Sequence, residues 1–183
     1  MDLSLAHFIN QLGHGLIDPL TELICEVPLL VGLWIALLLL ALRLDRNRGR
    51  LVAGTVLLAV AVHFLISEAL LKHLVLAELP MRVRPYLAHP DLIEPVGYRF
   101  TDSSFPSSHA ASTAAIVTVF GHAYRRFALV GAGFAVLMCF SRVHNGMHYP
   151  TDVLTGSLLG VGYGAVAIRG AVEHGRRRAG VVA

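Results

Sequence analysis

The sequence predicts an all-α integral membrane protein, a helical bundle of five to six spans with an interfacial N-terminal helix. Of the 183 residues, 55% are hydrophobic and only 15% are charged, whereas a soluble domain carries about a quarter of charged residues. The mean hydropathy is +0.65. Long apolar runs also alternate with short polar clusters rich in arginine and histidine. These observations together predict one membrane-embedded domain over residues 1–183.

Residues 1–26 are expected to lie in the membrane interface. Gly13, Gly15 and Pro19 interrupt this segment, and it is too polar for an ordinary span, which favours one or two interfacial helices. No cleavable signal peptide is expected, because the segment lacks a basic start and contains four acidic residues.

Five apolar runs are long enough to form the core of a span, and six spans remain the alternative. The first run, 27–42, has Pro28 in its first turn and ends at Arg43. The other four are 51–71, 109–123, 127–140 and 152–168. Most are shorter than the ~20 residues of a full span, so polar flanks are expected to extend each helix. Glycines in the last run are expected to allow close helix contact: Gly156, Gly160, Gly162 and Gly164.

Basic residues are unevenly divided between the two ends of this bundle. One end has ten: Arg43, Arg46, Arg48, Arg50, Arg125, Arg126, Arg169, Arg176, Arg177 and Arg178. The other has five: Lys72, Arg82, Arg84, Arg99 and Arg142. The positive-inside rule places the first end in the cytoplasm, so residues 169–183 are expected to form a cytoplasmic tail. The proline-rich residues 72–108 are then expected to form an extracytoplasmic active-site loop.

The chain is therefore expected to cross its membrane several times, with the end that includes residues 72–108 facing the outside. Nucleic-acid binding is not expected, because the basic residues lie between apolar runs and not on one soluble face. The lipid bilayer is the expected environment, and no obligatory protein partner is predicted.

Three polar clusters on the extracytoplasmic side contain the candidate chemical groups. They are residues 82–85, residues 105–109 and the stretch Ser-Arg-Val-His-Asn-Gly-Met-His-Tyr-Pro-Thr-Asp at 141–152. Ionisable groups at a membrane-helix boundary indicate a functional site. We expect the three clusters to converge around one phosphate.

His148 and Asp152 are four residues apart, so one helical turn would place them on the same face. A carboxylate bonded to one imidazole nitrogen fixes the tautomer and leaves the other nitrogen free to attack. Because Pro150 disfavours helix at Tyr149, the pair is expected on a turn that leads into the last span. Asp152 is expected near the N-cap of that span.

The remaining candidate residues have properties suited to binding an anion. The guanidinium of Arg142 is a planar fork that fits two phosphate oxygens. Ser107 and Ser108 lie where a helix is expected to begin, and a helix N-terminus favours an anion. His109, in the first turn, could donate a proton to a leaving oxygen. Arg84, beside the rigid Pro85, would add a second cation.

These residues resemble the signatures of a known family. Pro-Ser-Ser-His at 106–109 and Ser-Arg-x5-His-x3-Asp at 141–152 are similar to the second and third signatures of the type-2 phosphatidic acid phosphatase superfamily. That superfamily includes lipid phosphate phosphatases, bacterial acid phosphatases and vanadium haloperoxidases. Ser108 replaces the usual glycine of the second signature. The first signature, Lys-x6-Arg-Pro, is matched only by Arg84-Pro85, so Lys72 or Arg82 would take the place of its lysine.

The resemblance implies a role for each matched residue. His148 would be the nucleophile that forms a phosphohistidine, Asp152 would orient it, and His109 would protonate the leaving group. The implied phosphate-binding residues are Arg142, Arg84, Ser107, Ser108, Lys72 and Arg82. No metal or other cofactor is implied.

The substrate implied by the resemblance is a membrane lipid phosphate. Leu12-Gly13-His14-Gly15 and the run from Arg84 to His89 look most like bacterial undecaprenyl-diphosphate phosphatases. Phosphatidylglycerophosphate, phosphatidate and lipid A are the alternative substrates.

The sequence leaves three further hypotheses open. A non-catalytic protein that binds or moves phospholipid is the alternative class. His144 and His148 with Asp152 could bind zinc, although no third histidine or cysteine is suitably spaced. Arg99 and Asp102 could form a loop salt bridge or contact the substrate.

Overall fold

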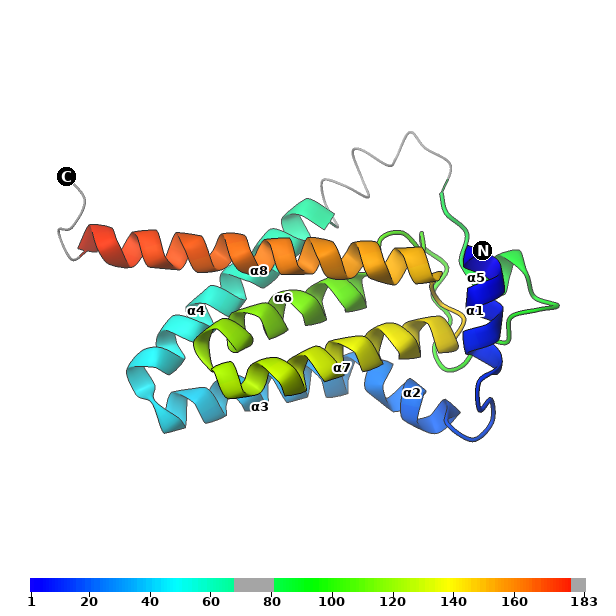
Figure 1. Ribbon diagram of the computed structural model, residues 1–183, viewed down its shortest axis with the longest axis horizontal. Helices are drawn as coiled ribbons and strands as arrows, with labels where there is room; N and C mark the ends of the chain where they lie inside the picture. The colour runs from blue at the N-terminus through cyan, green and yellow to red at the C-terminus, as the bar shows by residue number, and fades with distance from the viewer. Residues whose placement is uncertain (68–80, 179–183) are drawn as a thin grey trace.

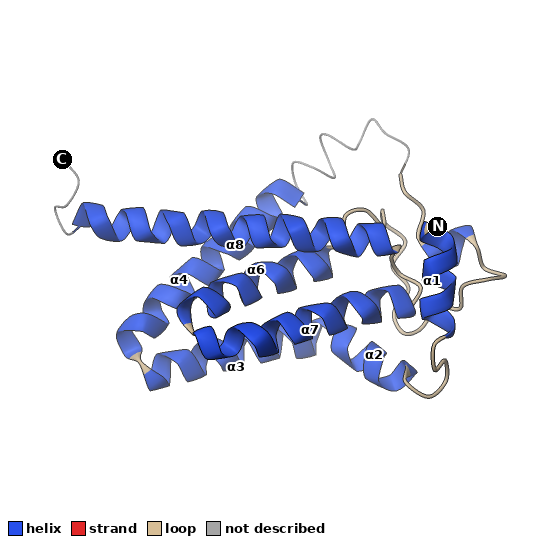
Figure 2. Ribbon diagram, viewed as in Figure 1, coloured by secondary structure: helices blue, strands red, loops and turns tan. Residues whose placement is uncertain are grey.

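Every regular element in the computed structural model is a helix within the described residues, which are 1–67 and 81–178 (Figures 1 and 2). The helices are α1 (Asp2–Gln11), α2 (Asp18–Cys25), α3 (Val27–Leu44), α4 (Arg46–His63), α5 (Pro85–Ala88), α6 (Ser108–Ala123), α7 (Arg125–His144) and α8 (Pro150–Arg178). A short π-helical stretch continues α4 to Ser67. Lys72 and part of the 72–108 loop lie outside the described residues.

The helices α3, α4, α6, α7 and α8 run along the long axis of the molecule, and α6 lies among the others (Figure 1). It packs most extensively against α8 and α7 and also contacts α4. Within the described residues, four helices are long and apolar enough to cross a membrane: α3, α4 with its extension, α7 and α8, with mean hydropathies of 2.4, 2.0, 1.6 and 1.3. The sequence prediction of an all-α membrane bundle is confirmed. A helix lies at each of the five expected spans, but α6, with 16 residues, is not among these four.

Polar residues cap the helices and extend them beyond their apolar runs. Asp45 accepts a hydrogen bond from the Arg48 amide at 3.0 Å and so begins α4. The Ser107 hydroxyl accepts one from the Ala110 amide at 3.5 Å and begins α6. Capping of this kind satisfies amide groups that have no partner within the helix.

Glycines bring the backbone of α8 against the backbone of α6. A Cβ atom at Gly156 would lie 2.5 Å from the carbonyl oxygen of Ser107, and one at Gly164 would lie 2.9 Å from that of Ala115. A Cβ atom at Gly160 would overlap the carbonyl oxygen of Ala111. The expected close contact therefore forms at these three glycines, but not at Gly162, where a Cβ atom would meet nothing within 4 Å.

The two ends of the bundle have different compositions. The α3–α4 turn, the α6–α7 turn and the C-terminal end of α8 share one end (Figure 1), where the Arg48 guanidinium lies 5.2 Å from the centre of the Tyr124 ring. At the other end, α1 lies across the ends of α7 and α8, close to α5 and α2 (Figure 1). The three polar clusters all lie at this second end.

The first ten residues of the expected cytoplasmic tail at 169–183 continue α8 as a helix to Arg178. No proline interrupts this stretch, and its arginines favour the C-terminal end of a helix dipole.

Two hydrophobic clusters stabilise the bundle. One fills the space between the long helices and includes Trp34, Val56, Phe120, Met138 and Tyr163. The second lies at the end of the bundle with the polar clusters and includes Ala6, Tyr86, Ile93, Val143, Met147, Tyr149 and Val153. The second cluster holds the turn between α7 and α8 in place.

Candidate active site

His148 lies on the turn between α7 and α8. The carboxylate of Asp152 accepts a hydrogen bond from the Tyr149 amide at 2.8 Å, which is half of a capping box, and Pro150 is the first residue of α8. Met147 and Tyr149 are both buried in the second hydrophobic cluster. Packing on both sides therefore fixes the backbone that carries His148.

The imidazole of His148 is only 3% exposed, and both of its nitrogens have defined partners. Nδ1 lies 2.7 Å from the Ser104 carbonyl oxygen, so Nδ1 carries the proton and donates it. Nε2 then carries a lone pair, and it lies 3.3 Å from Nη1 of Arg84 and 3.3 Å from Nη2 of Arg142. The nitrogen available for attack thus faces two guanidinium groups.

Asp152 does not make the hydrogen bond to His148 that the spacing suggested. Its Oδ2 atom lies 3.8 Å from Nδ1, which is too long for a hydrogen bond, because that oxygen accepts from the Tyr149 amide. Its Oδ1 atom accepts from Arg82 at 2.6 Å. The carbonyl of Ser104 fixes the imidazole tautomer, and Asp152 lies beside it as a buried negative charge.

The electrostatic surroundings keep His148 neutral. Burial lowers the pKa of His148 well below the usual 6.5, and the positive charges of Arg142 and Arg84 lower it further. A neutral imidazole has the lone pair that a nucleophile requires.

Arg84 is held rigidly by the loop that precedes α6. Its Nη2 donates to Asp102 at 2.6 Å, its Nε donates to the Asp102 carbonyl at 3.0 Å, and its Nη1 donates to the Met147 carbonyl at 3.0 Å. The sequence left open whether Asp102 forms a salt bridge in the loop or contacts the substrate. In the structure, Asp102 forms an ion pair with Arg84.

Arg142 is 2% exposed, and it makes no ion pair with a carboxylate within residues 1–67 and 81–178. Its Nε atom is buried and has no hydrogen-bond partner in this part of the chain. A buried charge without a counter-ion is costly. Arg142 is therefore suited to bind an anion that enters the site.

Phe100 lies between the two arginines and His109, which belongs to the polar cluster at residues 105–109. The centre of its ring lies 5.4 Å from the guanidinium carbon of Arg84, 5.3 Å from that of Arg142 and 6.1 Å from the centre of the His109 ring. His109, in the first turn of α6, also has its Nε2 atom 3.2 Å from the Cys25 carbonyl oxygen. His109, Arg84 and Arg142 thus surround one aromatic ring next to His148.

The other phosphate-binding candidates have different partners. Ser107 is fully buried, where it caps α6 and donates its amide to the Asp152 carbonyl at 3.2 Å; Ser108 is the first residue of α6. Arg82 is not part of the cradle around His148, because it bonds Asp2 and Asp152, each at 2.6 Å. Its guanidinium also lies 4.4 Å from the Tyr149 ring, so Arg82 connects α1 to α8.

Phe100 and Ser104 contact the candidate site, and the sequence did not indicate either of them. Phe100 is one aromatic residue in an irregular loop, and Ser104 contributes a main-chain carbonyl that any residue would provide. Neither has a spacing or residue type that separates it from its neighbours. His144 does not join His148 and Asp152 in a zinc site, because its Nε2 atom faces Asp18 at 2.9 Å.

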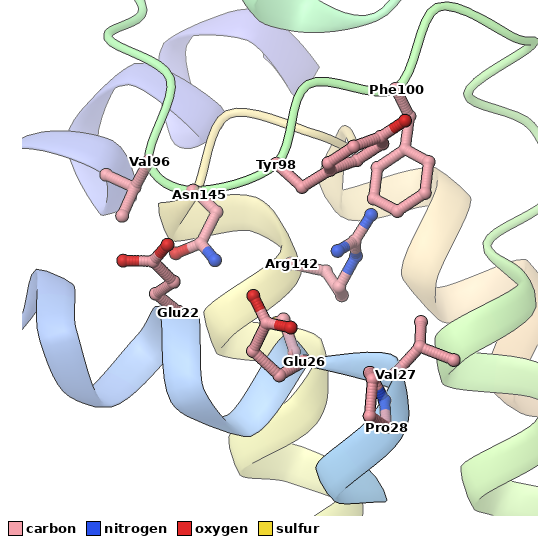
Figure 3. Close-up of a pocket in the computed structure, with 11 residues that line it drawn as sticks. Glu22, Glu26, Val27, Pro28, Val96, Tyr98, Phe100, Arg142 and Asn145 are labelled. Atoms are coloured by element: carbon pink, nitrogen blue, oxygen red, sulfur yellow. The ribbon is translucent and has the colours of Figure 1, made fainter. Parts of the chain in front are cut away.

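Within the described residues, a polar pocket and an apolar groove reach this site. A pocket of about 320 Å³ exposes Arg142, whose guanidinium points toward Phe100 while Glu22 and Glu26 lie on other walls (Figure 3). A groove of about 360 Å³ is lined almost entirely by apolar residues of α3, α4 and α6, with Ser108 and His109 among them. The polar pocket reaches the cradle at Arg142, and the apolar groove reaches His109.

Comparisons with known proteins agree with this architecture. The sequence model of the PAP2 superfamily matches residues 52–176. The bacitracin transport permease protein BcrC of Bacillus licheniformis is 27% identical over 169 residues, which cover 88% of this chain and 76% of that protein. An undecaprenyl-diphosphatase of Sulfolobus acidocaldarius is 36% identical over 124 residues, which cover 66% of this chain and 55% of that protein. The crystal structure of Aquifex aeolicus LpxE has the same fold, with a TM-score of 0.67, 22% identity, and coverage of 92% of this chain and 94% of that one.

Proposed function

The chain belongs to the PAP2 superfamily, and on this premise we propose that it is a membrane lipid phosphate phosphatase that forms a phosphohistidine at His148. Membership confirms the family and the class of phosphoric ester hydrolase that the sequence predicted. The roles of individual residues are part of the proposal. The observation that supports them most directly is that Nε2 of His148 lies 3.3 Å from both Arg84 and Arg142.

In the first step, Nε2 of His148 attacks the phosphorus while Arg84 and Arg142 bind the non-bridging oxygens. The bond from phosphorus to the leaving oxygen breaks as the N–P bond forms, and His109 donates a proton to that oxygen. The phosphorylated imidazole keeps its Nδ1 proton on the Ser104 carbonyl. Its positive charge is stabilised by Asp152, whose carboxylate lies 3.8 Å away.

In the second step, water attacks the phosphorus and gives one proton to His109. The N–P bond breaks, inorganic phosphate leaves, and His148 is neutral again. The pocket that exposes Arg142 offers a polar route for this water and for the phosphate. One water is consumed and the lipid product carries the proton from His109, so the cycle balances.

The apolar groove supports a lipid substrate. It runs between α3 and α4, includes Trp34, Leu38 and Phe64, and reaches His109, where the leaving group would receive its proton. A chain in this groove would place its phosphate between His109 and the two arginines. Ser108, at the start of α6, would lie near the phosphate, because a helix N-terminus favours an anion. Ser107 would act through the cap of this helix, since its hydroxyl accepts from the Ala110 amide and its amide donates to the Asp152 carbonyl.

The proposed substrate is a polyprenyl-linked phosphate, with undecaprenyl diphosphate as the best candidate. A relative with the name undecaprenyl-diphosphatase supports this choice. Phosphatidylglycerophosphate, phosphatidate and lipid A are the competing substrates. Lys72 lies outside the described residues, so its role as a phosphate ligand stays a prediction.

We further propose a bacterial inner membrane as the location, with the site facing the periplasm or the outside. The lipid bilayer and its lipid phosphate are the proposed partners, and we expect no obligatory protein partner. The division of basic residues between the two ends of the bundle supports this orientation.

Phosphate release by the purified protein over these four lipids tests the proposal. We expect release from undecaprenyl diphosphate to be fastest, and we expect H148A to abolish release from all four while lipid binding is retained. Release that is unchanged in H148A would remove His148 from its role. Lipid binding without any phosphate release by the wild-type protein would favour the non-catalytic alternative.

A further inference from the structure

A second group of ionisable side chains lies outside the site, where the N-terminal helices meet the end of α7. His14 is on the turn between α1 and α2, Asp18 begins α2, and His144 ends α7. Nε2 of His144 lies 2.9 Å from Oδ1 of Asp18, and Nδ1 of His14 lies 3.4 Å from Oδ2 of Asp18. One ligand atom from each of the three residues lies within 4.8 Å of the other two.

The outer nitrogen of each imidazole already has an acceptor. Nδ1 of His144 lies 3.1 Å from the Ile9 carbonyl oxygen, and Nε2 of His14 lies 3.0 Å from a carboxylate oxygen of Glu94. Metal-binding histidines are usually held in this way, by a carbonyl or a carboxylate on the nitrogen that does not bind the metal. With the ring protons on these outer nitrogens, the inner nitrogens of His14 and His144 carry lone pairs that face Asp18.

The inner atoms need a positive charge between them. Nδ1 of His14 is buried and has no hydrogen-bond partner among the described residues. Two lone pairs and a carboxylate that face one another repel unless a proton or a cation lies between them. Ligand atoms of a tetrahedral zinc lie about 3.3 Å apart. Nε2 of His144 lies 2.9 Å from one oxygen of the Asp18 carboxylate, and Nδ1 of His14 lies 3.4 Å from the other oxygen.

We propose that Nδ1 of His14, the Asp18 carboxylate and Nε2 of His144 bind one Zn²⁺ ion, with water as the fourth ligand. Imidazole and carboxylate are ligands that zinc accepts readily. Glu94 orients His14 from outside the ligand set, as the Ile9 carbonyl orients His144.

The ion would act as a cross-link and would not take part in the phosphatase chemistry. It joins the α1–α2 turn to His144, which is two residues after Arg142 and four before His148. Asn10 already links the same segments, since its side-chain amide donates to the His144 carbonyl at 2.6 Å and to the Glu94 carbonyl at 2.8 Å. A metal at this place would stabilise the turn that carries the nucleophile.

The test uses full-length protein in detergent, purified without a polyhistidine tag and stripped with a chelator. We expect elemental analysis after Zn²⁺ addition and desalting to give one Zn²⁺ per chain. A hundredfold excess of free Zn²⁺ over its Kd should raise the Tm by about 5–10 °C. Co²⁺ should give the visible absorption of a tetrahedral site.

Two variants and one control assign the ion to this cluster. H14Q and D18N should each lose the bound Zn²⁺ and the rise in Tm. H7Q should keep both the bound Zn²⁺ and the rise in Tm. His7 lies on α1, outside the cluster, and its ring contacts the Leu92 carbonyl at 2.7 Å. Zn²⁺ that binds equally well to H14Q and D18N, or a wild-type Tm that does not respond to Zn²⁺, would overturn the proposal. Such a result would indicate that Asp18 pairs with the two imidazoles without a metal, and it would leave the role of His148 untouched.

Discussion

Two buried guanidinium groups flank the imidazole of His148, and their charge helps to decide its protonation state. Burial is the larger cause of the lowered pKa of His148, and Arg142 and Arg84 add to it. The active form is the neutral one, so activity is lost as the pH falls through this pKa. Because the pKa is lowered, the acid limb of the kcat/KM profile should lie below pH 6.5.

Replacing Arg84 with glutamine should move this acid limb toward higher pH. The change removes a positive charge 3.3 Å from Nε2, which makes the protonated imidazole less unfavourable and raises the pKa of His148. We also expect kcat/KM at its optimum to fall by about 10²–10³, the usual loss when one donor to a transition-state oxygen is removed. The pH dependence of kcat/KM measures both effects.

R84K is the matched control, because it keeps the charge and loses the planar fork. Its kcat/KM should fall, while the acid limb should stay close to its wild-type position. An acid limb that does not move in R84Q would contradict the assignment of that limb to His148.

The spacing of residues in the sequence was enough to select His148, Arg142, Arg84 and His109 as candidates. It did not predict which partner each of these residues contacts. Their residue types limited what chemistry they could perform. Asp152 shows why spacing is insufficient: it lies on the expected helical turn, but its oxygens bond Tyr149 and Arg82. Hydrogen bonds between residues far apart in the chain depend on how the loops fold over the site.

Among the helices, the contact between α6 and α8 decides whether the site can assemble. The carbonyl of Asp152 accepts from the Ser107 amide at 3.2 Å, so the first turns of the two helices are joined directly. Gly156, Gly160 and Gly164 allow this approach, because a side chain at each would meet the backbone of α6.

Replacing Gly160 with valine should separate α8 from α6. The new side chain would overlap the Ala111 carbonyl, and overpacking of this kind costs about 1–3 kcal/mol. We expect the Tm to fall by several degrees and phosphate release to fall with it, as measured by thermal unfolding in detergent and by activity assay.

Gly162 on the same helix provides the control, because a Cβ atom there meets nothing within 4 Å. G162A should keep the wild-type Tm or raise it slightly, since alanine favours a helix over glycine. Equal losses of Tm in the two variants would contradict the close contact.

Hydropathy located the five long helices, because each contains an apolar run that a helix must bury or place in lipid. It underestimated their lengths, since capping residues such as Asp45 and Ser107 lie in polar sequence. The placement of α1 across the end of the bundle was not predicted. It depends on pairs such as Asp2 with Arg82, which are 80 residues apart.

For the whole molecule, the division of charge between the two ends predicts its orientation. The end without the site includes the α3–α4 turn, and the end with the site includes the loop around Tyr98 (Figure 1). Single cysteines in a C25A/C139S background can report each end. Y98C should react with a membrane-impermeant maleimide on intact cells, because Tyr98 is 71% exposed.

R46C, at the first residue of α4, is the matched position at the opposite end. It should react only after the cells are permeabilised. Labelling of R46C and protection of Y98C on intact cells would reverse the proposed orientation.

The covalent intermediate is the central claim, and it can be measured directly. The protein is mixed with ³²P-labelled lipid substrate, quenched within milliseconds and digested, and the labelled peptide is identified by mass spectrometry. We predict an acid-labile, base-stable phosphate on His148 that forms before free phosphate appears and is absent from H148N. Turnover of the lipid without label on the protein, or with label on another residue, would contradict the account.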